Sequence, residues 1–167
     1  MNKHYIKYSG LLIVFVLLQA LILNEVLFFT YINPYLYLSL IISLPLKTSK
    51  SFLLIYAFIL GFSIDIFVGS LGFHSTATVF IAFIKPAIAK ITIPYNILED
   101  TDEITFHKIG NKSFIVFSLL IILIHNCMLF IMEHLHFNSQ ILGKIIASSI
   151  VTLLLVLILE IFKFSKK

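Results

Sequence analysis

Charged residues are scarce in this chain of 167 residues, where they make up 12% against 60% hydrophobic residues, and the mean hydropathy is +1.07. Soluble domains carry about 25% charged residues, so the composition excludes a soluble globular protein and indicates a membrane protein. Tryptophan and arginine are both absent, and lysine therefore supplies every positive charge behind the net charge of +4. The single cysteine, Cys127, excludes an internal disulfide.

Apolar runs dominate what remains, and a helix needs about 20 such residues to cross a bilayer. We expect spans over residues 10–29, 31–46, 52–68, 73–91, 113–132 and 142–164. The second span is short and is opened by Asn33-Pro34, an early position at which a helix tolerates proline. The polar segment 94–112 is expected to be a solvated cytoplasmic loop. The chain is therefore predicted to be one all-α integral membrane domain, a bundle of six transmembrane helices.

The positions of the lysines predict how this bundle is oriented. Lysines precede the first span, lie between the second and third, flank segment 94–112 and follow the sixth, whereas only Lys144 lies on the opposite side. By the positive-inside rule, both termini are then cytoplasmic. Membrane orientation explains the lysine excess, and no nucleic-acid partner is needed.

Asp65 is the most informative single residue, because it lies within an apolar span. A charge at the centre of a bilayer costs at least about 2.5–3.5 kcal/mol. The spacing of Ala57, Gly61, Asp65 and Gly69 puts them on one helix face, and small residues on such a face allow another helix to pack closely. Together with Gly72 in the glycine-rich turn that follows, they form a predicted packing face. This face closes either within the chain or against the helix of a partner. Gly143, Ala147 and Val151 form a smaller face of this kind in the sixth span.

Lys85-Pro86 lies inside the fourth span and has two interpretations. Lys85 is either an internal cation that partners Asp65, or a lysine whose side chain reaches the cytoplasmic interface. The helical rise places Asp65 in the outer half of its span and Lys85 nearer the cytoplasmic end, so a direct pair requires a long reach. Asp65 can otherwise cap the glycine turn or tie the third and fourth spans together through backbone N–H groups. Pro86 is expected to kink the fourth span.

Motifs for catalysis or metal binding are lacking. The sequence contains neither G-x-S-x-G nor H-E-x-x-H, and the histidines lack the cysteine and carboxylate partners of a zinc site. His125 is expected to form hydrogen bonds between helices. An intramembrane enzyme with Asp65 as general acid or base is the last-ranked alternative, because it needs a second group within reach. We therefore predict no catalytic, cofactor or metal site.

Three segments together resemble a known family. They are 32-INPYLYLSLIISLPL-46, 60-LGFSIDIFVGSLGFHS-75 and Lys85-Pro86, and they are similar to the corresponding segments of MreD, a family of bacterial rod shape-determining membrane proteins. The family often has Arg-Pro where this chain has Lys85-Pro86, and lysine lacks the planar fork of arginine.

The resemblance implies a non-catalytic scaffold of the bacterial inner membrane, required for rod shape and lateral peptidoglycan synthesis. Its implied partners are an MreC-like protein, MreB, RodZ, RodA with its penicillin-binding protein, and membrane lipid. The implied bundle resembles the substrate-binding subunits of energy-coupling-factor vitamin transporters. Asn33 and Pro34 would then order the outer ends of the second and third spans together with Asp65. The alternative function is a small-molecule, vitamin-type binding subunit of a transporter, which would need a ligand cavity under the outer loops.

Overall fold

The computed structural model describes residues 2–24, 32–100, 104–134 and 138–164. Every regular element among these residues is a helix. Four of them are long and apolar enough to cross a membrane: α3 (Lys50–Val68), α4 (Phe73–Thr92), α7 (Asn111–His134) and α8 (Ser139–Phe164). The shorter elements are α1 (Asn2–Leu18), the π-helix η1 (Gln19–Leu23), α2 (Leu38–Ser43), α5 (Tyr95–Asp100) and α6 (Phe106–Ile109). The described residues thus confirm an all-helical fold with four apolar helices of membrane-spanning length.

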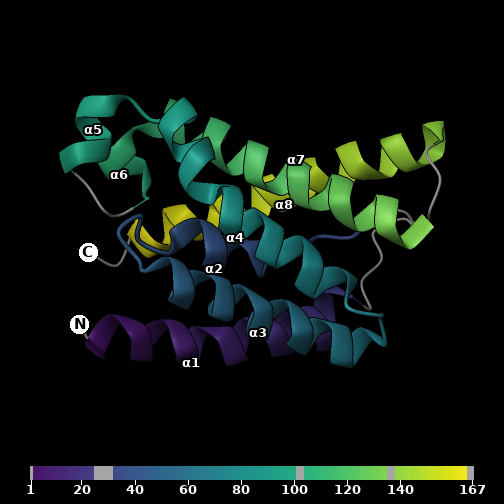
Figure 1. Ribbon diagram of the computed structural model, residues 1–167. Coiled ribbons are helices and arrows are strands. Elements are labelled where there is room, and N and C mark those ends of the chain that lie inside the picture. The colour runs from purple at the N-terminus through teal and green to yellow at the C-terminus, as the bar shows by residue number, and fades with distance from the viewer. Residues whose placement is uncertain (1, 25–31, 101–103, 135–137, 165–167) are drawn as a thin grey trace.

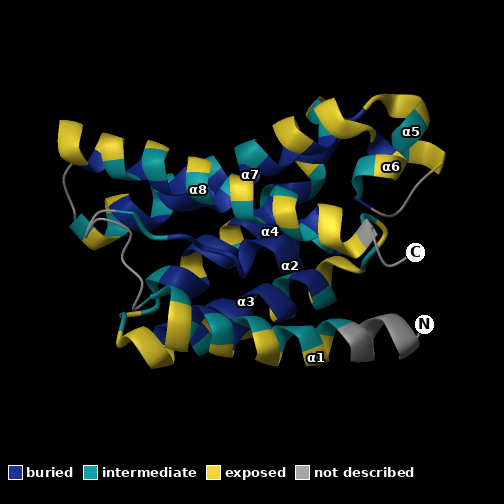
Figure 2. Ribbon diagram, turned by 180° about the vertical axis from the view of Figure 1, so that it is seen from behind, coloured by how far each residue is buried: buried dark blue, intermediate teal, exposed yellow. Residues whose placement is uncertain are grey.

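The long helices lie side by side, with the short helix α2 near the middle of the bundle (Figure 1). Helices α1 and α3 lie on one side of α2, and α7 and α8 lie on the other (Figure 1). Buried residues face inward, and exposed residues cover the outer faces of the long helices (Figure 2). The short helices α5 and α6 lie at the same end of the bundle as the chain termini (Figure 1).

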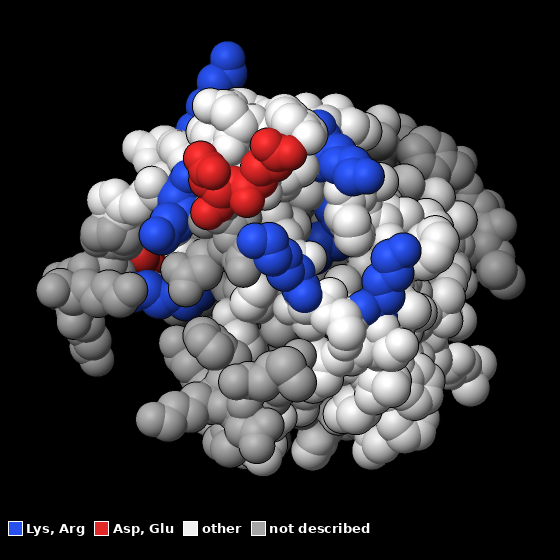
Figure 3. Space-filling model, turned by 60° about the vertical axis from the view of Figure 1, so that its left-hand side comes forward, with Lys and Arg blue, Asp and Glu red and all other residues white. Residues whose placement is uncertain are grey.

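This end of the bundle carries most of the described lysines, and we call it the lysine-rich end. Figure 3 shows it with lysines gathered around a small acidic cluster. The described lysines at the ends of helices or in loops here are Lys47, Lys50, Lys90, Lys108, Lys112 and Lys163. Lys144, near the start of α8, lies at the other end.

The prediction of a helix over residues 31–46 is wrong for most of that range. Helical structure covers only Leu38–Ser43, and residues 32–35 are not helical. A residue before proline is disfavoured in the α conformation, so Asn33-Pro34 prevents a helix rather than opening one. Nevertheless, every residue from 34 to 42 is buried. The segment therefore lies inside the bundle with part of its backbone outside any helix.

The remaining expected spans correspond to helices with small shifts of their ends. The expected ranges 52–68, 73–91, 113–132 and 142–164 coincide with α3, α4, α7 and α8 to within three residues. The first expected span, 10–29, begins earlier, in α1, and its residues 25–29 lie outside the described part of the chain. Segment 94–112 is not simply a solvated loop, because it contains α5 and α6 and buries Ile104 and Ile109. Its acidic residues Asp102 and Glu103 lie outside the described residues.

Helices α3 and α4 form a hairpin that is closest near Gly61. A Cβ atom added to Gly61 would lie 2.5 Å from Ser75 Cα and 2.7 Å from the His74 carbonyl oxygen, and it would also clash with Thr78 Oγ1. One turn away, Thr78 Oγ1 donates a hydrogen bond to the Ala57 carbonyl at 2.9 Å. The small side chains of α3 therefore bring the two backbones into direct contact.

The turn between these helices depends on two glycines with positive φ. Gly69 ends α3 at φ 72°, and Gly72 precedes α4 at φ 86°. Glycine adopts such values without the steric cost that a Cβ atom imposes. The chain can therefore reverse within a few residues, and α4 returns along α3.

We predict that Gly61→Ala destabilises the protein by about 1–3 kcal/mol, because the new methyl group would overpack the interface against backbone atoms. The free energy of unfolding in mixed detergent micelles measures this loss. The matched control is Gly10→Ala in α1, where a Cβ atom would have no neighbour within 4 Å. Equal stability of both variants would contradict the close contact.

Candidate functional site

Asp65 caps the N-terminus of α4 from the last turn of α3. Its Oδ1 accepts hydrogen bonds from the backbone N–H of His74 at 2.9 Å and from the Ser70 hydroxyl. Its Oδ2 accepts from the backbone N–H of Ser75 at 2.9 Å. The first N–H groups of a helix lack partners within the helix, and its N-terminus favours negative charge. The carboxylate thus satisfies both needs, and it is only 3% exposed.

Lys85 performs the opposite task at the other end of the bundle. Its Nζ donates to the carbonyl oxygens of Ile41, at 2.7 Å, and Leu44, both at the C-terminal end of α2. The last carbonyls of a helix lack partners within it, and a cationic side chain is favourable there. Lys85 is 1% exposed, so its side chain points into the bundle and does not extend to the interface.

Three other side chains hold the non-helical start of the buried segment. The backbone N–H of Asn33 donates to Ser148 Oγ at 3.1 Å, and that of Tyr35 donates to Thr152 Oγ1 at 3.0 Å. Gln19 makes two hydrogen bonds to this segment, because its Oε1 accepts from the Leu36 N–H at 3.0 Å and its Nε2 donates to the Pro34 carbonyl at 2.8 Å. Backbone groups at membrane depth need partners within the protein, and these residues supply them from η1 and α8.

A series of buried hydrogen bonds links Tyr37, directly before α2, with α4, α7 and α8. The Tyr37 hydroxyl lies 2.9 Å from His74 Nδ1 and 3.1 Å from His125 Nε2. His125 Nδ1 lies 3.2 Å from Asn126 Oδ1, and Asn126 Nδ2 donates to Ser149 Oγ at 2.9 Å. All five side chains are at most 3% exposed.

The acceptors in this series of hydrogen bonds determine which group donates in each bond. An amide oxygen only accepts, so the bond to Asn126 assigns a proton to His125 Nδ1 and leaves His125 Nε2 as an acceptor. Tyr37 then donates to His125 and accepts from His74 Nδ1–H. Both imidazoles can be neutral with every one of these bonds made. The arrangement is therefore a complete interhelical network, which is the role expected for His125.

The structure brings some of the expected site residues together and separates others. Ala57, Gly61 and Asp65 lie on the α3 face that packs against α4, while Gly69 and Gly72 form the turn beyond it. Asp65 and Lys85 do not meet, because Lys85 is ten positions along α4 from Ser75, about 15 Å along the axis. Each binds backbone atoms instead.

Asn33 and Pro34 contact elements other than the expected ones. They bond to α8 and η1 and make no hydrogen bond to the outer end of α3. Pro86 lies within α4, which continues to Thr92.

Sequence reasoning missed several residues on which the buried segment depends. Gln19 is an amide inside an apolar run, and the argument applied to Asp65 would have identified it. Ser148 and Thr152 are four residues apart and share one face of α8, yet hydroxyls are so common in membrane helices that this spacing has little specificity. Tyr37 gave no signal, since tyrosines surround it in the sequence.

The described residues contain no group of three or more histidine, cysteine, aspartate or glutamate side chains that could hold a metal ion. His74 and His125 share the Tyr37 hydroxyl, and His136 lies outside the described residues. No family model, curated protein or solved structure matches the chain.

We predict that Asp65→Asn lowers the free energy of unfolding by about 1–2 kcal/mol, because the amide keeps one acceptor oxygen and loses the other. Asp65→Leu removes both acceptors and should cost more. The free energy of unfolding in mixed micelles should therefore decrease in the order wild type, Asp65→Asn, Asp65→Leu. Asp100→Asn is the matched control, because Asp100 is an exposed carboxylate in α5. Equal losses for the Asp65 and Asp100 variants would contradict the capping role.

We predict that Lys85→Met destabilises the protein by about 2–3 kcal/mol, because two buried carbonyls lose their donor. Lys90→Met, an exposed position on the same helix, should have little effect. In the double variant D65N/K85M, the two losses should add within about 0.5 kcal/mol, as expected for distant sites without shared partners. A coupling energy above about 1 kcal/mol would instead indicate an ion pair between Asp65 and Lys85.

Proposed function

We propose that this protein is a non-catalytic scaffold of the bacterial inner membrane, like the MreD proteins that it resembles, and that it binds an MreC-like partner. One observation carries this proposal. The buried polar side chains that would be candidates for chemistry, above all Asp65 and Lys85, bind backbone atoms of this chain. Their hydrogen-bonding capacity maintains the shape of the bundle. A role for that shape in assembling other proteins is the simplest use of such a structure.

Six membrane crossings are part of the proposal. The apolar helix Tyr8–Leu23 supplies one in addition to the four long helices. The buried segment supplies the sixth, because Asn33 contacts Ser148 and Ser43 Oγ accepts from Lys163 Nζ at 2.9 Å. Ser148 and Lys163 are fifteen positions apart in α8, which is about 22 Å at about 1.5 Å per residue and most of a hydrocarbon core of about 30 Å.

The proposed orientation places the lysine-rich end in the cytoplasm, with both chain termini on that side. Lysine excess on one side of a membrane protein is the main determinant of its orientation. The N-terminus, the C-terminus, α5 and α6 all lie at this end (Figure 1). Partners that act in the cytoplasm, such as an actin-like MreB, would bind at this end.

The outer face of α8 is the proposed binding surface for the single transmembrane helix of an MreC-like protein. The small face of α3 is occupied by α4 and is not available. Helix α8 is the least buried of the four long helices. A Cβ atom on its Gly143 would have no neighbour within 4 Å, so another backbone can approach there. Large apolar side chains are exposed along the length of the same helix, at Leu142, Ile146, Ile150, Leu154 and Ile158. Small residues with apolar neighbours are typical of helix contacts in membranes.

A vitamin-type binding subunit of a transporter is the second candidate. The observation in its favour is the non-helical backbone of residues 32–35 inside the bundle, since transporters often build their sites around interrupted helices. A rise in melting temperature with one compound from a vitamin panel would favour this candidate over the scaffold.

Affinity purification in mild detergent, from the bacterium that encodes the chain, tests the scaffold. We expect an MreC-like protein to co-purify with the wild type and to be lost, at least about tenfold, from Gly143→Leu, because the larger side chain holds the partner's backbone away. Gly10→Leu is the matched control, at another helical glycine with open space around it. Cells depleted of the protein should become round. Rod shape in its absence, with no MreC-like protein retained by the wild type, would contradict the proposal.

A further inference from the structure

An apolar groove of about 400 Å³ lies between α3 and α4 at the lysine-rich end. Leu53 and Leu54 form its α3 wall, and Phe83, Pro86 and Ala87 form much of its α4 wall. Phe83 is 71% exposed, so this wall faces outward from the bundle. The groove therefore opens where a membrane protein meets lipid.

The groove follows from the uneven spacing of the α3–α4 hairpin. The helices touch at Gly61 and at the hydrogen bond from Thr78 to the Ala57 carbonyl. One turn further toward the lysine-rich end, Leu53 and Ala82 both line the groove. Close approach at one end of the hairpin and larger side chains at the other thus leave a space between the two helices.

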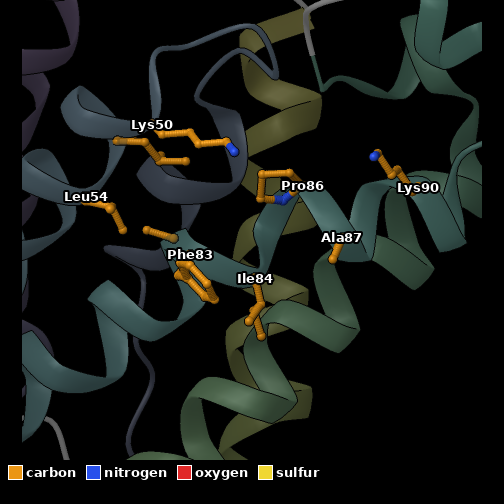
Figure 4. A pocket seen from close by; sticks show the side chains of 9 residues that line it. Lys50, Leu54, Phe83, Ile84, Pro86, Ala87 and Lys90 are labelled. Atoms are coloured by element: carbon orange, nitrogen blue, oxygen red, sulfur yellow. The ribbon is translucent and has the colours of Figure 1, made fainter.

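Two lysines stand at the mouth of this groove. Lys50 is the first residue of α3, and Lys90 lies in the last turn of α4. Both are exposed, and their nitrogen atoms lie on either side of Pro86 at the same end of the groove (Figure 4). The described residues that line the groove include no acidic side chain, so the two ammonium groups determine its charge.

We propose that the groove binds an anionic glycerophospholipid. The two ammonium groups hold the phosphate and the charged headgroup, and the apolar walls hold the upper part of an acyl chain. Phe83 lies seven residues from Lys90, which is about 10 Å along α4 at about 1.5 Å per residue. That distance matches the upper part of a hydrocarbon leaflet about 15 Å thick. Basic residues at a membrane interface above an apolar surface are the pattern that recognises anionic lipid.

The absence of tryptophan from the sequence makes a direct test possible. Phe83→Trp places the only tryptophan of the protein in the groove, and brominated lipids quench its fluorescence on contact. The vesicles consist of phosphatidylcholine and contain either brominated phosphatidylglycerol or brominated phosphatidylcholine. We expect the anionic lipid to bind beside the introduced indole roughly tenfold more strongly than the brominated phosphatidylcholine. Phe62→Trp, on the exposed face of α3, is the control and should not distinguish the two lipids. Equal quenching by both lipids at position 83 would overturn the proposal.

Charge variants in the Phe83→Trp background assign the preference to the two lysines. Lys50→Gln with Lys90→Gln should abolish it. Lys108→Gln with Lys112→Gln removes the same charge from exposed positions outside the groove and should preserve it. A preference that survives the first pair, or that the second pair removes equally, would overturn the site. If quenching by both lipids falls as the protein-to-lipid ratio rises, a second copy of the protein occupies the groove. That result would also overturn the proposed lipid site.

Discussion

A peptide group inside a hydrocarbon layer must find its hydrogen-bond partner within the protein, and the architecture of this bundle depends on how residues 32–44 meet that requirement. Helix formation supplies hydrogen-bond partners for only part of the backbone of this segment. Gln19, Ser148, Thr152 and Lys85 satisfy much of the rest, and they come from three separate helices. An unsatisfied group costs several kcal/mol in lipid. The segment therefore fixes η1, α4 and α8 around itself.

Asp65 and Lys85 are matched to helix ends of opposite polarity. The carboxylate binds the N-terminus of α4, and the lysine on α4 binds the C-terminal carbonyls of α2. Each charge therefore joins two elements, and α4 takes part in both contacts. Together with the close approach at Gly61, these bonds explain how ionisable residues can be tolerated inside the bundle while serving its shape.

The sequence predicted the features that depend on local pattern. Apolar length identified α3, α4, α7 and α8, and the four-residue spacing from Ala57 to Asp65 identified the face that packs on α4. It failed where the outcome depends on distant partners. An apolar run such as 31–46 does not reveal that its backbone N–H groups bond to Ser148 and Thr152, more than a hundred residues away. Likewise, the acceptors of Lys85 are backbone carbonyls, which every residue possesses, so no side-chain pattern could single them out.

The long sequence separation of those bonds has a consequence for how the protein is made. The α3–α4 hairpin can form as soon as its own residues enter the membrane, because its contacts join near neighbours in the chain. The hydrogen bonds of Asn33 and Tyr35 form much later, since their acceptors on α8 are 115 and 117 positions further along the chain. Helix α8 leaves the ribosome only after more than a hundred further residues have been added. The central segment is thus synthesised long before the helix that completes its hydrogen bonds, so this part of the core is finished only when α8 has been added.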